Sequence, residues 1–278
     1  MYTMVPVKTD DTSLAACSTL LCSVFPNATT LSKASLQWHY ADNPNGRAVG
    51  FNAVSEDGEL AAHYVCLPIL ARIDGVTNKG LLSMNTATHP KHQGKGLFVE
   101  LARRTFDYAR DAGYDFVVGA ANQNSTHGFV KKLGFQLVTP LDAKIGVGAI
   151  SSKANVDAPA FERIWDQASI AWRLSNPVVR YGVSGADIWA PTGRPMINAL
   201  IGRHEQAATF ARSGAPGVLH VWIGKDPTLR WDASRLYRDV PRRLRPSPLN
   251  LIFLDLTDEE RTLNAELVKF WAMDFDAY

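Results

Sequence analysis

The sequence of 278 residues has no long uninterrupted apolar run, although hydrophobic residues make up 46% of it. A membrane-spanning helix needs about 20 consecutive apolar residues, so no membrane partner is expected. The first 25 residues also lack the basic leader and apolar stretch of a secretory signal peptide. These absences favour a globular cytoplasmic protein.

Cysteine is scarce, and neither sign of charge dominates. The three cysteines, Cys17, Cys22 and Cys66, are odd in number and lack metal-ligand spacing, which argues against a disulfide framework and a zinc site. We expect them to be small buried side chains and expect no metal. A formal charge of +2 is too small for a nucleic-acid-binding face, so nucleic acid is excluded as a partner.

The first 90 residues alternate between helical and strand periodicity. An apolar alternation at 1–7 predicts a strand, and the run to Phe25 predicts a helix capped by Asp11 or Thr12. A second helix is predicted over 31–40, before a turn at 43–46. Three later stretches, each separated by a glycine-containing turn, predict an antiparallel meander: 48–54, 59–73 and 81–89.

The next segment reads as glycine loop, helix, strand and helix. Apolar residues recur at helical spacing from 96 to 112 and Gly113 provides a stop, while 114–120 has the pattern of a buried strand. A further helix is predicted to be capped by Ser125 and to stop at Gly134. Residues 139–160, punctuated by proline and glycine, are predicted to connect two halves.

The sequence around Trp38 recurs around Trp172. With one gap, these pairs fall into register: Ser35/Ser169, Trp38/Trp172, Asn43/Asn176, Pro44/Pro177 and Arg47/Arg180. Strand 81–90 is matched by 217–227, and strand 115–120 by 249–256, each expected to precede a helix. A similar offset over this distance favours an internal duplication, and Trp38 is expected to be core.

The loop HPKHQGKGLF, residues 89–98, has the chemistry of an anion site. It lacks the spacing of a Walker loop, and Val99 stands where a dinucleotide-binding fingerprint needs its third glycine. Gly94 and Gly96 nevertheless allow close backbone approach, and the next helix points its free N–H groups at the loop. Nearby positive charge is offered by Lys91, His92, Lys95 and Arg103 or Arg104. The alternative is an ordinary strand-to-helix turn with solvated lysines.

Three segments in order resemble the GCN5-related N-acetyltransferases (GNAT). They are the strand LLSMNTATHP, the loop Lys91-His92-Gln93-Gly94-Lys95-Gly96, and ANQNSTHGFVKKLGFQLV at 121–138. The likeness covers about residues 2–140 and, weakly, the second half, and is nearest to bacterial two-domain members. It implies an α/β (α+β) fold of two tandem GNAT-like domains, each a mixed, mostly antiparallel sheet flanked by helices. Residues 1–145 would bind acyl-CoA, and 146–278 would be degenerate and serve the acceptor side or support.

The resemblance implies a set of residues that contact the coenzyme, in part through backbone N–H groups. The set is Thr86, Thr88, Lys91, His92, Gln93, Gly94, Lys95, Gly96, Leu97, Asn122, Asn124 and Phe129. Two departures stand out. Lys91 replaces the usual glutamine or arginine, and Phe129 and Val130 occupy the region where the family often has a thiolate-protonating tyrosine. In the second half, KDPTLRW replaces the glycine loop and puts Asp226 toward the phosphates, so one coenzyme site is predicted.

The sequence offers two candidates for the catalytic base. His63 is the first choice, because strand counting places it near Asn85 and Thr86 and its ordinary pKa of about 6.5 suits proton uptake. His39 is the second choice, and Asn85 completes the catalytic set. A packed sheet histidine is the alternative for His63, and water or the thiolate could take the proton instead. Asp274 and Asp276 are expected in a solvated tail or at the acceptor.

The predicted function is transfer of an acyl group from acyl-CoA, by direct attack, to a primary amine of a small acceptor. An amino sugar, including a nucleotide-linked one, is the preferred acceptor. The alternatives are a non-catalytic CoA-binding or regulatory module and an acetyltransferase for peptides or other amines. Acetyl-CoA or another acyl-CoA is the expected co-substrate, and a monomer or homodimer is expected.

Overall fold

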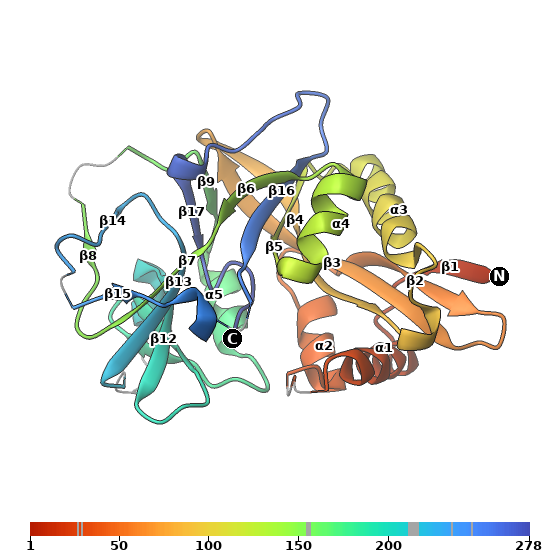
Figure 1. Ribbon diagram of the computed structural model, residues 1–278, viewed down its shortest axis with the longest axis horizontal. Helices are drawn as coiled ribbons and strands as arrows, with labels where there is room; N and C mark the ends of the chain where they lie inside the picture. Colours follow the sequence, from red (N-terminus) through yellow and green to blue (C-terminus); the bar gives the residue numbers. More distant parts are fainter. Residues whose placement is uncertain (27, 29, 154–156, 211–216, 235, 246) are drawn as a thin grey trace.

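In the computed structural model, the chain folds into two mixed α/β halves that share one continuous sheet (Figure 1). The structure describes residues 1–278 except 27, 29, 154–156, 211–216, 235 and 246. Within the described residues, no helix is long and apolar enough to span a membrane.

The first half follows the predicted order of helices and strands. Its elements are β1 (Tyr2–Pro6), α1 (Asp11–Val24), α2 (Lys33–Tyr40), β2 (Val49–Ser55), β3 (Leu60–Ile73), β4 (Val76–Thr88), the 3-10 turn η1 (Pro90–His92), α3 (Leu97–Asp111), β5 (Phe116–Ala121), α4 (Gln123–Leu133) and β6 (Gln136–Pro140). Strands β1 to β4 pair antiparallel in chain order, and β4 pairs parallel with β5. The predicted antiparallel meander is therefore confirmed.

The second half is richer in short strands, and α5 is the one α-helix among its described residues. Its elements are β7 (Asp142–Gly146), β8 (Ser151–Ser152), β9 (Phe161–Arg163), α5 (Gln167–Leu174), β10 (Gly182–Ser184), β11 (Asp187–Pro191), β12 (Ile197–Arg203), η2 (Glu205–Phe210), β13 (Leu219–Lys225), β14 (Leu229–Arg230), β15 (Arg238–Asp239), η3 (Arg242–Leu244), β16 (Asn250–Asp255), η4 (Ala265–Leu267) and β17 (Val268–Trp271). The whole is a mixed α/β fold with a mostly antiparallel sheet flanked by helices.

Strands cross the predicted boundary at 145/146. Strand β16 pairs with β5 on one side and β6 on the other, and β9 pairs with β3. Strand β7, from the predicted connection, pairs with β13; residues 154–156 of that connection lie outside the described part. The division into residues 1–145 and 146–278 therefore stays a prediction about folding units.

Two apolar cores lie on opposite faces of the first-half sheet. Helices α1 and α2 cover one face and α3 and α4 the other (Figure 1). The heptad-like pattern of α3 explains its orientation, because Leu97, Leu101 and Phe106 are all buried against the sheet. The sheet is thus fixed from both sides where β4 and β5 begin to diverge.

Several local predictions are wrong in detail. Asp10 caps α1, and Asn122, not Ser125, caps α4, because each side chain accepts hydrogen bonds from backbone N–H groups of the first turn. Cys17 and Cys66 are buried as expected, but Cys22 is exposed. After β16 the described residues form turns and η4 instead of the expected helix.

The repeated tryptophans meet at the junction of the halves. Trp38 on α2 and Trp172 on α5 stack with ring centroids 4.5 Å apart. Each indole N–H donates to the backbone carbonyl of the other tryptophan, at 3.0 and 3.1 Å. This reciprocal pattern is what a local two-fold axis between duplicated helices produces, and it places Trp38 in the core.

The expected solvated tail instead packs against the protein, with Asp274 buried and Asp276 partly buried. The Asp274 carboxylate accepts from the Trp165 indole N–H at 2.7 Å, and Asp276 contacts both Arg173 and His39. Burial alone raises the pKa of a carboxyl group, but the Arg173 guanidinium and His39 outweigh it and hold the pKa of Asp276 well below its usual range. The C-terminal residues therefore connect α2 and α5 through the contacts of Asp276.

Candidate active site

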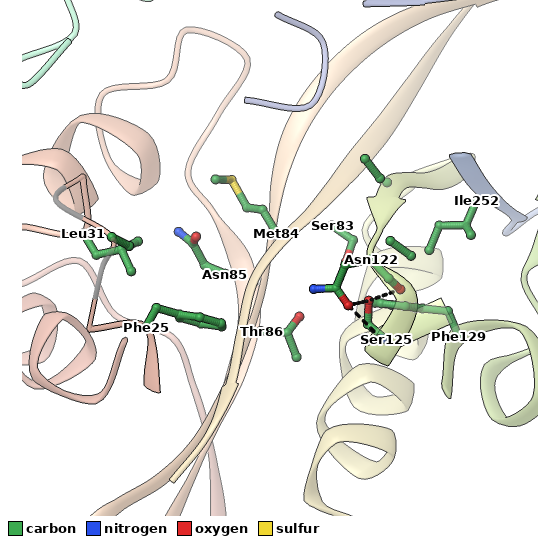
Figure 2. Close-up of a pocket in the computed structure, with 14 residues that line it drawn as sticks. Phe25, Leu31, Ser83, Met84, Asn85, Thr86, Asn122, Ser125, Phe129 and Ile252 are labelled. Carbon is green, nitrogen blue, oxygen red and sulfur yellow. Dashed lines mark hydrogen bonds between the residues drawn. The ribbon is translucent and has the colours of Figure 1, made fainter. Parts of the chain in front are cut away.

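A cavity of about 320 Å³ opens where β4 and β5 part. The two strands pair only over Gly80–Leu82 and 116–118, after which they separate. A glycine is required at position 80, since a Cβ there would lie 2.1 Å from the Phe116 ring. The cavity is lined from β4 by Ser83, Met84, Asn85 and Thr86, from β5 and α4 by Asn122, Ser125 and Phe129, and from α1 and its following loop by Phe25 and Leu31 (Figure 2).

An irregularity in β4 shapes the middle of this cavity. The register with β3 shifts between His63 and Val65, which face Ala87 and Met84, so Asn85 and Thr86 form a bulge. Asn85 has a φ of 48°, a left-handed conformation that asparagine tolerates better than most residues. Figure 2 shows Asn85 on the side of Phe25 and Leu31 and Thr86 on the side of Ser125.

A buried hydrogen-bond chain holds the Asn85 side chain. Its Nδ2 donates to the Tyr40 hydroxyl at 3.0 Å, and that hydroxyl lies 3.0 Å from His63 Nε2. The other ring nitrogen, His63 Nδ1, lies 2.6 Å from Asn52 Oδ1, which can only accept. His63 therefore carries its proton on Nδ1, and Tyr40 donates to Nε2.

His63 is fully buried and does not line the cavity. Burial lowers the pKa of its imidazole to about 4, so the expected pKa near 6.5 is wrong. The physical reason is that no anion compensates the lost hydration of an imidazolium there. At neutral pH His63 is a neutral ring that accepts from Tyr40.

The glycine loop encloses a second cavity, of about 230 Å³, at the N-terminus of α3. Gly94 and Gly96 both have a φ of 76°, which only glycine adopts without strain. Gly96 occupies the cap position of α3 without a capping side chain, so the first-turn N–H groups face the loop cavity. This is a suitable cradle for a phosphate group.

Two of the basic side chains around the loop already have hydrogen-bond partners. Lys95 donates to the Tyr2 hydroxyl at 2.8 Å, and His92 contacts the same hydroxyl at 2.8 Å and Glu59 at 3.3 Å. Glu59 and His92, with His89, form a group of possible metal ligands within 4.8 Å of one another, adjoining the loop. The expectation of no metal stays a prediction.

The predicted site residues separate into three groups. The cavity between β4 and β5 is lined by Asn85, Thr86, Asn122 and Phe129, and the loop cavity by Thr88, His92, Gln93, Gly94, Lys95, Gly96 and Leu97. Four lie outside both linings: His63, His39, Lys91 and Asn124. His39 contacts the Ser35 carbonyl at 3.1 Å and the Asp276 carboxylate at 2.7 Å.

Among the lining residues that the sequence did not assign, Lys132 and Ser125 carry polar groups suited to the chemistry. Lys132 faces the loop cavity from the end of α4, and Ser125 lies one turn before Phe129 on the cavity side of that helix. The spacing of four between Ser125 and Phe129 was a usable signal, because such residues share a helix face. Arg103 and Arg104 are bound elsewhere, to the Lys132 carbonyl and to Glu100.

Within its described residues, the second half has no equivalent of the glycine loop. Asp226, expected to face phosphates, is buried and accepts from the Trp271 indole N–H at 2.7 Å and from Thr228. Its carboxylate thus organises the turn Pro227–Leu229 instead. Within the described residues, the loop after β4 is the glycine-rich strand-to-helix turn that leads into a long helix.

The chain was compared with known families and structures. The family model for an acetyltransferase (GNAT) domain matches residues 7–138, and no curated protein matches the chain. Saccharomyces cerevisiae N-myristoyltransferase with bound myristoyl-CoA has a TM-score of 0.59 at 9% identity, over 91% of this chain and 82% of that chain. A GCN5-related N-acetyltransferase from Anabaena variabilis has a TM-score of 0.56 at 10% identity, over 92% and 73%.

At such identities the structural likeness establishes the fold, and it extends over both halves. The sequence match to the family model is confined to the half that contains the glycine loop and the cavity between β4 and β5. Residues 7–138 therefore form a domain of the acetyltransferase (GNAT) family, and the likeness in fold continues over the rest of the chain.

Proposed function

We propose that the protein transfers an acyl group from coenzyme A to a primary amine of a small acceptor in the cavity between β4 and β5. The observation that carries this proposal is the parting of these two strands directly beside the glycine loop. The loop and the N-terminus of α3 bind the pyrophosphate, with Lys132 as a cationic partner. The pantetheine arm then enters between the strands and brings the thioester to the bulge at Asn85 and Thr86.

The Asn85 side chain is suited to orient the attacking amine. Its Nδ2 is committed to Tyr40, and within the described residues no hydrogen bond engages its Oδ1. In our proposal Oδ1 accepts an N–H of the neutral amine and directs the nitrogen lone pair at the thioester carbonyl. Tyr40 and His63 are positioning residues in this scheme, because neither lines the cavity.

The reaction balances without a protein base. The amine nitrogen bonds to the carbonyl carbon, the carbon–sulfur bond breaks, and the departing thiolate takes the proton that the amine loses. Ser125 provides a hydroxyl on the cavity face of α4, four residues before Phe129. In the proposal this hydroxyl turns from Asn122, to which it donates at 3.1 Å, and stabilises the thiolate by a hydrogen bond. The family's tyrosine is absent here, and the proton that neutralises the thiolate comes from the amine.

The acceptor proposed is an amino sugar, including nucleotide-linked ones. Its support is the mixed lining of the cavity, in which Asn85, Thr86, Ser125 and Asn122 supply hydrogen-bonding groups for hydroxyls. Peptides and other small amines are the alternatives. A non-catalytic CoA-binding module is the competing function, since no ionisable side chain is found among the described residues that line this cavity.

The direct test is thiol release from acetyl-, octanoyl- and myristoyl-CoA, each mixed with amino sugars, nucleotide-linked amino sugars, polyamines and peptides. We expect at least one amine to accelerate release and to be recovered as the amide by mass spectrometry. If CoA binds but no amine accelerates release, the transferase proposal fails and the binding-module alternative replaces it.

Lys132 and Lys131 provide a matched pair for the coenzyme site. Lys132→Ala removes a cation that lines the loop cavity, whereas Lys131 is equally exposed but does not line it. We expect Lys132→Ala to raise the KM for acyl-CoA about 5- to 20-fold, as loss of one charge-assisted contact predicts. Lys131→Ala should change the KM for acyl-CoA less than twofold. If both variants raise the KM equally, the phosphates bind elsewhere.

A further inference from the structure

A further cavity lies away from the coenzyme cradle, in the second half. It has a volume of about 630 Å³, within the range of small-molecule sites. Aliphatic side chains from β7 and β13 form its floor, among them Ala143, Ile145, Val221 and Ile223. A cavity of this size and apolarity favours a ligand with a substantial hydrocarbon part.

The polar lining of this cavity has one sign of charge. Arg194, in the turn after β11, and Arg245, after η3, both line it, and no aspartate or glutamate does. Arg245 donates through Nε to the Val240 carbonyl at 2.9 Å. This bond fixes the side chain and leaves its two terminal nitrogens available to a ligand. Within the part of the chain described, neither arginine forms an ion pair. Two uncompensated guanidinium groups beside an apolar cavity favour a carboxylate.

The apolar cavity and the cavity between β4 and β5 are both lined from the region of β16, by Leu249 just before this strand and by Ile252 within it, respectively. Ser247 lines the apolar cavity, and its hydroxyl accepts from the backbone N–H of Gln123 at 3.3 Å. Gln123 follows Asn122, which lines the cavity between β4 and β5. The two cavities therefore come close at the N-terminus of α4 but share no lining residue.

We propose that this second cavity binds a medium- or long-chain carboxylate, with its hydrocarbon chain between β7 and β13 and its carboxylate at Arg194 and Arg245. The site goes beyond the acyl transfer proposed above and does not depend on it. Its occupant is distinct from acyl-CoA, which the loop cavity recognises through phosphate.

The test is isothermal titration calorimetry of the full chain with decanoate, below micellar concentration, and with decanol as the matched uncharged chain. We expect decanoate to bind at one site at least tenfold more tightly than decanol. The double variant Arg194→Gln/Arg245→Gln should weaken decanoate at least tenfold and change decanol less than twofold. Both arginines are at least partly exposed, so the variant is expected to fold.

Two further measurements locate the site. Val221→Trp, which fills the cavity floor, should abolish binding of both compounds, whereas Lys132→Ala at the coenzyme loop should leave decanoate affinity unchanged. Saturating CoA should also leave it unchanged. The proposal is overturned if decanol binds as tightly as decanoate, if the double arginine variant binds normally, or if CoA displaces decanoate. Acyl transfer plays no part in these readouts, so a failed amine screen leaves them interpretable.

Discussion

At the scale of single residues, the Tyr40 hydroxyl has the widest consequences. It joins a fully buried histidine to the asparagine at the β4 bulge, through two hydrogen bonds of 3.0 Å. A buried polar group that loses its partner keeps the full cost of its desolvation. The geometry at Asn85 and the stability of the core therefore depend on the same hydroxyl.

We predict that Tyr40→Phe lowers the free energy of unfolding by about 1–3 kcal/mol, because His63 Nε2 loses its donor. It should also lower kcat, with little change in the KM for acyl-CoA, because Asn85 is released while the coenzyme loop is untouched. Urea unfolding and thiol-release kinetics measure the two effects. Tyr114→Phe removes a hydroxyl from another tyrosine of the same half and should alter neither; an unchanged kcat in Tyr40→Phe would contradict the positioning role.

His63 also predicts how stability depends on pH. Its pKa is about 4 in the folded protein and about 6.5 in the unfolded chain, so the unfolded state binds the extra proton between these values. This contribution is fully present above pH 6.5 and is lost as pH falls through 4. It amounts to about 3 kcal/mol.

The check is urea unfolding of the wild type and His63→Gln at pH 7, 5.5 and 4. The wild type should lose more of its unfolding free energy than His63→Gln does, because glutamine does not titrate. His127→Gln, which replaces an exposed histidine on α4, should follow the wild type. Parallel curves for the wild type and His63→Gln would contradict the depressed pKa.

At the scale of secondary-structure elements, α2 and α5 are the clearest pair. Both have eight residues and place a tryptophan at the sixth position, and both are capped by an oxygen of the residue before them, Ser32 and Asp166. Their indoles donate to each other's backbone, so each helix satisfies a polar group of the other. Packing between the halves is thereby coupled to the register of both helices.

We expect Trp38→Phe and Trp172→Phe each to cost about 1–3 kcal/mol of unfolding free energy, through one lost hydrogen bond and reduced stacking. The double variant should cost less than the sum of the two, by about 0.5–1.5 kcal/mol, since the pair is lost once. A double-mutant cycle by urea unfolding measures this coupling. Trp189 lies in a different core cluster, so a Trp38/Trp189 cycle should be additive within about 0.5 kcal/mol.

At the scale of the whole molecule, one sheet pairs strands that lie far apart in the sequence. Strand β16 supplies six residue pairs to β5 and also pairs with β6, so residues from near the end of the chain lie between these two first-half strands. Leu251, Ile252 and Phe253 of this strand are buried in the first-half cores. The catalytic half is completed by the second half.

A fragment of residues 1–145 is therefore predicted not to unfold cooperatively. It loses β16, which leaves the outer edge of β5 unpaired and its apolar neighbours exposed. The same fragment joined through a glycine–serine linker to residues 249–256 should regain part of the near-ultraviolet circular dichroism. A cooperative thermal transition in the bare fragment would show that residues 1–145 are an independent folding unit.

Much of the local structure could be predicted because its signals are local. The apolar spacing of α3, the turns of the β2–β4 meander and the two left-handed glycines of the loop depend on neighbouring residues only. The wrong caps of α1 and α4 show the limit of this approach, since several adjacent polar residues compete for one cap position. Asp10 and Asn122 are the N-caps because their side chains reach the first-turn N–H groups.

The sequence by itself predicted the GNAT acetyltransferase domain that the family model matches over residues 7–138, because the motifs that carry the likeness are contiguous. Only the tertiary structure decided that His63 is a buried neutral ring and that Asp276 is a partly buried carboxylate paired with Arg173 and His39, since burial and ion pairing come from residues far away along the chain. It also decided that Lys132 and Ser125 line the cavities and that β16 completes the first-half sheet. Pairings over more than a hundred residues leave no periodic trace in a single sequence.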